Sequence, residues 1–110
     1  LYSHFQPAVL KIMQHIVQQC QHQPTSLQVC GEMASDPLAI ILLVGLGYRE
    51  FSMNASSLSK VKRAISRFTV TEMQQIAESV MVIETEAKVK SELRQAIDQR
   101  DLSGLIRAGN

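Results

Sequence analysis

Three kinds of side chain in this sequence could have a chemical role: cysteine and histidine as acids or nucleophiles, and clustered lysine and arginine as a patch that binds phosphate or nucleic acid. Cys30 begins the run Cys30-Gly31-Glu32, in which a thiol is followed by a residue without a side chain and by a carboxylate. A thiol in such a run can act as a general acid, whereas a buried strand cysteine behaves as a small apolar residue. From these three residues alone, the buried interpretation is the commoner one.

The other cysteine and the histidines favour structural roles. Cys20 is spaced from the preceding apolar residues as on one face of a helix, which predicts a core position. His15 and His22 lie among glutamines, so we predict a solvated helix face rather than a phosphohistidine or a Cys/His pair. His4 lies in an irregular segment. The two cysteines make no disulfide framework, and no Cys/His spacing typical of zinc is present.

Charge and hydropathy exclude several classes of partner. The basic run Lys60, Lys62, Arg63 and Arg67 is soon followed by glutamates, which predicts a solvated helix face. The formal net charge of +1 favours neither nucleic acid nor anionic lipid as a partner. The longest apolar run, Pro37 to Leu46, is internal and too short to cross a bilayer. We expect a soluble, cytoplasmic protein, and the Leu1 start leads us to expect a fragment of a longer one.

The first third of the chain predicts a helix followed by a strand. Pro7, at a first helical position, begins a helix that extends to about His22, and Pro24 lies beyond its end. The run Leu27 to Cys30 is compatible with a strand and is stopped by Gly31. The predicted buried stripe of the helix is Val9, Leu10, Met13, Ile16, Val17 and Cys20.

A second helix and a second strand follow. Asp36-Pro37 predicts an N-cap and a first helical position, after a polar loop around Ser35. The helix from Leu38 to Val44 is apolar nearly all round, so it must be buried on most sides. We predict that Gly45 and Gly47 end this helix and that Phe51 to Met53 form a strand.

Three more helices are predicted after the second strand. Ser56 or Ser57 is the expected N-cap of the first, with a buried stripe of Leu58, Val61, Ile65 and Phe68. Thr69 and Glu72 form a capping box for the next, whose inward residues are Val70, Met73, Ile76, Ala77, Val80 and Met81. The last extends from about Thr85 to Arg100, with Val89, Leu93 and Ile97 at four-residue spacing.

The order of these elements predicts the fold class. Strands that alternate with helices indicate β-α-β units and a parallel sheet, which is an α/β fold, here predominantly helical. Two strands alone do not make a stable parallel sheet, because such sheets need several strands and cover on both faces. The sequence therefore describes a slice of an α/β fold rather than a complete one.

Several ordered motifs resemble one enzyme family. The runs Cys30 to Pro37 and Leu43 to Asn54 resemble the end of enzyme I of the bacterial phosphotransferase system, a phosphoenolpyruvate-protein phosphotransferase. The opening Gln6 to Leu10 is similar to the helix that precedes the cysteine strand in that family. The closing run Gly104 to Gly109, together with Gly47-Tyr48-Arg49, is similar to the nitrogen-related branch. The resemblance covers essentially the whole chain.

This resemblance implies that residues 1–110 are the C-terminal segment of a phosphoenolpyruvate-binding (β/α)8 barrel of the TIM type. Residues 1–68 would supply barrel strands seven and eight with their flanking helices, and residues 69–110 the closing helices. Cys30 would then lie at the C-terminal end of a barrel strand, where enzymes of this fold place their active sites.

The family also implies roles for individual residues. Its members transfer the phosphoryl group of phosphoenolpyruvate to a histidine and then to a phosphocarrier, and the cysteine that matches Cys30 protonates the enolate of pyruvate. Cysteine thiols, with an ordinary pKa of about 8.5, are largely protonated near neutral pH and suit this role. Gly31 would allow close backbone approach to the substrate and Glu32 would orient the loop. Ser35 departs from the glycine usual in the family, and Gln6 from its histidine.

Other requirements of the family are missing from this chain. The resemblance implies Mg²⁺ in the intact enzyme, a phosphocarrier of the HPr type from the nitrogen-related system, and a homodimer. The family's magnesium ligands, phosphate-binding arginines and phosphoaccepting histidine belong to other segments, so we expect the fragment alone to be inactive and metal-free. Two alternatives stay open: a non-catalytic helical interaction or dimerisation module, and a redox-active thiol at Cys30.

Overall fold

The computed structural model describes residues 4–21 and 27–99, apart from the side chain of residue 97. Its elements in chain order are α1 (Pro7–Cys20), β1 (Gln28–Val29), α2 (Glu32–Ser35), α3 (Pro37–Leu46), β2 (Glu50–Phe51), α4 (Ala55–Ile65), α5 (Val70–Met81) and α6 (Glu86–Asp98). The predicted order is confirmed with one addition, since the short helix α2 occupies the predicted polar loop. The expected helix ends at His22 and Arg100, the burial of Ile97 and the tail from Leu102 lie outside the described residues.

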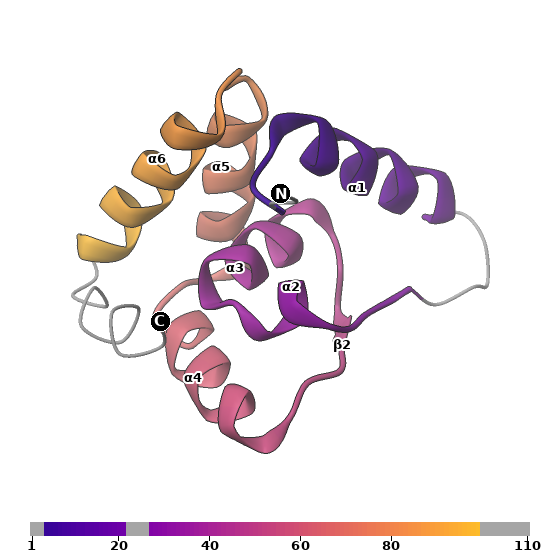
Figure 1. Ribbon diagram of the computed structural model, residues 1–110, viewed down its shortest axis with the longest axis vertical. Coiled ribbons are helices and arrows are strands. Elements are labelled where there is room, and N and C mark those ends of the chain that lie inside the picture. Colours follow the sequence, from indigo (N-terminus) through magenta and orange to yellow (C-terminus); the bar gives the residue numbers. More distant parts are fainter. Residues whose placement is uncertain (1–3, 22–26, 100–110) are drawn as a thin grey trace.

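The apolar helix α3 lies at the centre of the molecule, with α1, α4 and α5 arranged around it (Figure 1). Every residue from Pro37 to Val44 is buried, and Ile40, Ile41 and Leu43 are fully enclosed. The most extensive packing of α3 is against α5, and α4, α2 and α1 also contact it. A helix without a polar face needs such cover on most sides. The burial predicted for this helix is confirmed.

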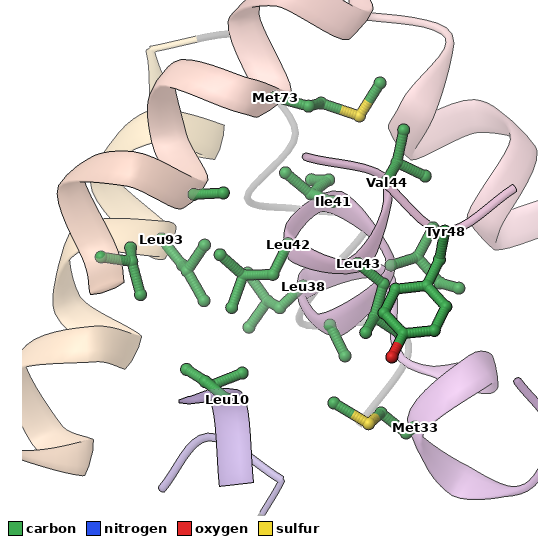
Figure 2. Close-up of a cluster of buried hydrophobic side chains, with 14 of the residues drawn as sticks. Leu10, Met33, Leu38, Ile41, Leu42, Leu43, Val44, Tyr48, Met73 and Leu93 are labelled. Carbon is green, nitrogen blue, oxygen red and sulfur yellow. The ribbon is translucent and has the colours of Figure 1, made fainter. Parts of the chain in front are cut away.

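The core is built from the side chains that the surrounding helices direct toward α3. Figure 2 shows Leu10 of α1, Met73 of α5 and Leu93 of α6 on different sides of the α3 residues Ile41 and Leu42. Each fully buried aliphatic side chain of this kind stabilises the folded state by about 1.5–3 kcal/mol. Helices α5 and α6 therefore share one core with α1 and α3.

The two strands pair in parallel, as the order of elements predicted. Gln28 lies opposite Glu50 and Val29 opposite Phe51, and the Ser52 amide donates to the Val29 carbonyl at 2.9 Å. Both strands are shorter than predicted, and β2 begins earlier than Phe51. The strands are short because an isolated pair of parallel strands is stabilised by few hydrogen bonds between strands. The parallel pairing places the residues that follow β1 and β2 at the same edge of the sheet.

Gly45 does not end the central helix, which contradicts the sequence prediction. It lies within α3, where the helix passes so close to α5 that a Cβ would overlap the carbonyl oxygen of Met73. That Cβ would also lie 2.9 Å from the Cβ of Ala77. Gly47 is the residue that ends α3, with a φ of 122° and an amide that donates to Leu43 and Val44 at 3.1 Å. One glycine therefore permits helix packing and the other terminates the helix.

Hydrogen bonds at the helix starts confirm two predicted caps and correct a third. The Asp36 carboxylate accepts from the Leu38 amide at 2.9 Å. Thr69 and Glu72 form both bonds of a capping box, at 3.0 and 3.1 Å. The cap of α4 is Asn54 rather than Ser56 or Ser57, because the chain is still extended at Asn54 and its side chain accepts from the Ser57 amide at 2.9 Å.

Three residues assigned to buried stripes are exposed. Ile16 is 38% exposed, Leu58 42% and Val70 44%. Val70 is the first residue of α5, ahead of the turn that packs on α3, while Ile16 and Leu58 lie on α1 and α4 away from the core. Cys20, expected in the core, is half-buried. Among the described helices, none is long and apolar enough to span a membrane.

Tyr48 should make the stability of the fold depend on alkaline pH. Its side chain is 3% exposed and its hydroxyl donates to the Met13 carbonyl at 2.8 Å. Burial raises the pKa of Tyr48, and the nearby Cys20 thiolate raises it further. The unfolded chain therefore loses the phenol proton first, from about pH 10, and the free energy of unfolding falls as the pH rises further. Urea unfolding of wild type and Tyr48→Phe at about pH 9 and about pH 11 should show a smaller fall in the variant; an identical fall would contradict this.

Candidate active site at the strand ends

Cys30 follows β1 directly, so its thiol lies at the carboxyl edge of the parallel pair. Its side chain is exposed and its thiol is free. The alternative of a buried apolar cysteine is therefore wrong for this chain. A free and accessible thiol can exchange its proton with solvent, which a general acid must do between turnovers.

Gly31 is required for the backbone conformation that follows Cys30. Its φ of 83° and ψ of −159° belong to a region that side-chain-bearing residues rarely adopt. No heavy atom among the described residues lies within 4 Å of the position a Cβ would take. The close approach of the backbone to substrate that the resemblance implies for Gly31 stays a prediction. The turn itself needs glycine.

The turn after Gly31 continues into α2 and is held at its far end. Glu32 is the first residue of α2 and is exposed. The Ser35 hydroxyl donates to the Gly31 carbonyl at 3.3 Å, and the Asp36 amide donates to the Met33 carbonyl at 3.4 Å. The orienting role suggested for Glu32 stays a prediction, whereas Ser35 makes a hydrogen bond that a glycine at that position could not.

A cleft of about 670 Å³ opens at the same edge of the sheet. Its volume is within the range of about 300–1,000 Å³ that small-molecule sites occupy. It is bounded by residues that follow both strands and by one face of α6. The lining residues are Phe5, Gly31, Glu32, Ser35, Asp36, Pro37, Leu38, Ser52, Met53, Asn54, Ser57, Lys90 and Arg94. Cys30 is not among these lining residues, but the next residue, Gly31, is.

The cations in this cleft come from a helix that sequence reasoning assigned no functional residue. Lys90 and Arg94 are four residues apart and therefore lie on one face of α6. The Lys90 ammonium is 3.3 Å from the Glu86 carboxylate and 5.7 Å from the centre of the Phe5 ring. The only sequence signal was this helical spacing, and nothing in it indicated that α6 lies near the strand ends.

The charges in the cleft wall are balanced. Glu32 and Asp36 are its acidic groups, and Lys90 and Arg94 are its basic groups. Asp36 is paired with His4, whose Nε2 lies 2.9 Å from the Asp36 carboxylate. In the described residues no three His, Cys, Asp or Glu side chains come together as a metal site would require. No reaction step is therefore assigned to a metal ion at these residues.

The other sequence-predicted candidates lie away from the cleft. His15 is exposed on α1, in agreement with a solvated face, and His22 is outside the described residues. Lys62, Arg63 and Arg67 are exposed on or just after α4. The structure brings together Gly31, Glu32 and the start of α4, including Asn54, whereas His15, Lys62, Arg63 and Arg67 do not line this cleft.

Comparison with known proteins gives the family. Residues 1–70 match the model of the PEP-utilising enzyme, PEP-binding domain, where PEP is phosphoenolpyruvate. A "Phosphoenolpyruvate-dependent phosphotransferase system" protein of Salmonella typhimurium is 32% identical over 109 residues, which is 99% of this chain and 15% of that protein. A "Phosphoenolpyruvate-protein phosphotransferase" of Mycoplasma pneumoniae is 34% identical over 102 residues, 93% of this chain and 18% of that protein.

A third relative extends the comparison. The phosphoenolpyruvate-protein phosphotransferase of Staphylococcus carnosus is 36% identical over 89 residues, 81% of this chain and 16% of that protein. The chain thus spans less than a fifth of the length of these curated relatives. The motifs around Cys30, the parallel strand pair and the family match all lead to the same assignment. This chain belongs to the family of PEP-utilising enzymes and carries part of their PEP-binding domain.

Proposed function

We propose that the intact protein is a phosphoenolpyruvate-protein phosphotransferase of the nitrogen-related enzyme I type, in which Cys30 protonates the enolate of pyruvate. The observation that carries this proposal is the free, exposed thiol of Cys30 at the end of a parallel strand, beside a cleft of substrate size, in a chain of this family. The phosphoryl group would pass from phosphoenolpyruvate to a histidine outside this chain and then to an HPr-like carrier.

The barrel arrangement is part of the same proposal. β1 and β2 would be strands seven and eight of a (β/α)8 barrel, with residues 69–110 as its closing helices. The β1–α3–β2 unit supports this, since neighbouring parallel strands joined by a helix are the repeating unit of such barrels. Exposed Ile12, Ile16 and Leu58 lie on α1 and α4, the helices that would meet the remaining barrel helices on either side.

In the proposed reaction the bond between phosphorus and the enol oxygen breaks and a bond from phosphorus to a histidine nitrogen forms. The electron pair that stays with the substrate gives the pyruvate enolate. Cys30 donates its Sγ proton to the methylene carbon, which yields pyruvate and a thiolate. Because the thiol is exposed, solvent can return the proton and complete the cycle. The proposal places Mg²⁺ and the substrate's phosphate ligands on parts of the protein outside this chain, and it includes a homodimer.

A direct test is to incubate the purified intact protein with phosphoenolpyruvate and Mg²⁺. We expect stoichiometric release of pyruvate and an acid-labile phosphohistidine, and we expect the phosphoryl group to move to an added HPr-like carrier. ATP in place of phosphoenolpyruvate is the matched control and should leave the protein unphosphorylated. Neither pyruvate nor phosphohistidine would appear if the chain belonged to a non-catalytic interaction or dimerisation module, and that result would refute the proposal.

A further inference from the structure

His4 forms a long-range contact next to the Cys30 turn. Its Nε2 lies 2.9 Å from Oδ2 of Asp36, and the two side chains are only 16% and 29% exposed. His4 precedes α1, whereas Asp36 lies between α2 and α3, so the bond ties together two segments 32 residues apart. The imidazole also packs at 4.5 Å, tilted by 56°, against the buried ring of Phe5. The histidine is thus held by packing as well as by its hydrogen bond.

Asp36 uses its two carboxylate oxygens for different purposes. Oδ1 accepts from the Leu38 amide at 2.9 Å and so caps α3, while Oδ2 accepts from His4. The Asp36 amide closes the short helix α2 by donating to Met33. The same residue therefore ends the α2 turn, starts the central helix and forms part of the cleft wall.

Asp36 is one of the residues that hold the turn after Cys30 in place. Gly31 joins Cys30 to α2, and its carbonyl accepts from the Ser35 hydroxyl at 3.3 Å, which ties the start of the turn to the residue before Asp36. The pairing of β1 with β2 holds the chain before Cys30, and Asp36 holds the chain where α2 ends. Asp36 in turn has one oxygen fixed by α3 and the other by His4.

We infer that His4 is a positioning residue for Cys30: through Asp36 it holds the turn that joins Cys30 to the wall of the cleft. Its part in turnover rests on the proposed function, whereas its effect on the thiol does not. The Nε2–H donor is present in one neutral tautomer and in the charged imidazole, so the bond does not depend on a single protonation state.

The test compares three variants of the intact protein. His4→Leu removes the donor and keeps an apolar side chain against Phe5. His4→Gln returns an amide N–H near the position of Nε2. His15→Leu is the matched control, since His15 is exposed on α1 and outside the cleft. For each protein, two quantities are measured: the rate of Cys30 alkylation by iodoacetamide, resolved by site with mass spectrometry, and kcat and KM for pyruvate formation.

We expect His4→Leu to change the Cys30 alkylation rate at least about threefold and to lower kcat about tenfold, with KM within about twofold, because misplacing a reacting group affects chemistry more than binding. His4→Gln should restore both values to within about twofold of wild type, and His15→Leu should change neither. The half-buried Cys20 thiol is the internal reference, since general loosening of the fold would raise its alkylation rate too.

Three outcomes would overturn the inference. One is unchanged Cys30 alkylation in His4→Leu; another is altered alkylation with unchanged kcat in an active enzyme. A parallel change at Cys20 that His4→Gln does not reverse would also count against it, because it would mark a general loss of stability. If the wild-type protein forms no pyruvate, the proposed function fails, and the alkylation comparison still decides whether His4 positions the thiol.

Discussion

Replacing Gly45 with alanine should lower the free energy of unfolding by about 3 kcal/mol, the upper end of the usual cost of overpacking. Helix propensity alone predicts the opposite sign, since alanine is favoured over glycine inside a helix by about 1 kcal/mol. The loss is expected because the new methyl group would overlap the Met73 carbonyl and crowd Ala77. A backbone carbonyl within α5 cannot rotate away as a side chain can, so α3 and α5 would have to separate.

The change is measured by urea unfolding, together with hydrogen exchange of the α5 amides in the intact protein. Ser59→Ala is the control, because Ser59 is an exposed position within α4 where alanine should be neutral or slightly stabilising. Adding Ala77→Gly to Gly45→Ala removes the contact with the Cβ of residue 77 but not the one with the Met73 carbonyl, and a glycine inside α5 itself costs about 1 kcal/mol, so the double variant should stay well below wild type in stability. A Gly45→Ala protein as stable as wild type would mean that α3 and α5 do not approach as closely as described.

Cys30→Ala should lower kcat for pyruvate formation at least about 100-fold, the lower range of what a positioned general acid contributes. KM for phosphoenolpyruvate should change little, since the proposed role of the thiol begins only after the phosphoryl group has left. The fold should tolerate the change because Cys30 is exposed and its side chain supports no buried contact. Cys30→Ser should also be slow, since a hydroxyl is a much weaker acid than a thiol.

The most direct measurement follows the proton itself. A phosphoenolpyruvate analogue with one methylene hydrogen replaced by methyl, turned over in D₂O, gives 2-oxobutyrate deuterated at one face of the enolate if an enzyme group delivers the proton. Cys30→Ala should lose this facial selectivity, because solvent would protonate both faces. Cys20→Ala is the control and should keep both rate and selectivity. Unchanged turnover and unchanged selectivity in Cys30→Ala would remove the thiol from the mechanism, and rapid oxidation of Cys30 would favour the redox alternative instead.

Local features of the fold followed from the sequence with few errors. The caps at Asp36 and Thr69, and the burial of the apolar helix that follows Asp36, were predicted and confirmed. These features depend on residues at most four positions apart, so the pattern of a short segment contains the necessary information. The position of Cys30 at the end of a strand belongs to the same class, because β propensity and Gly31 define that boundary locally.

The errors occur where a residue's environment depends on another segment. Glycine often ends a helix, so Gly45 was predicted to end α3. It lies inside α3 instead, at the point where α5 packs too closely to leave room for a side chain. Ile16 and Leu58 fit buried stripes by spacing, yet no described element covers them. Periodicity predicts which face of a helix is apolar, but it does not say how wide a contact the neighbouring helix will make.

By itself the sequence determined most of the helices, the caps at Asp36 and Thr69, the strand that precedes Cys30 and the resemblance to enzyme I, because short-range spacing and motif order depend only on residues close together in the chain. Only the tertiary structure decided what surrounds Cys30: the His4–Asp36 bond across the turn, the cleft at the strand ends, and the arrival of Lys90 and Arg94 from α6. Those contacts join residues tens of positions apart, and Lys90 and Arg94 reach the cleft because α6 packs on α5, which in turn packs on the central helix. The position of Cys30 after a strand could therefore be predicted from neighbouring residues, whereas the residues around it could be identified only from the tertiary structure.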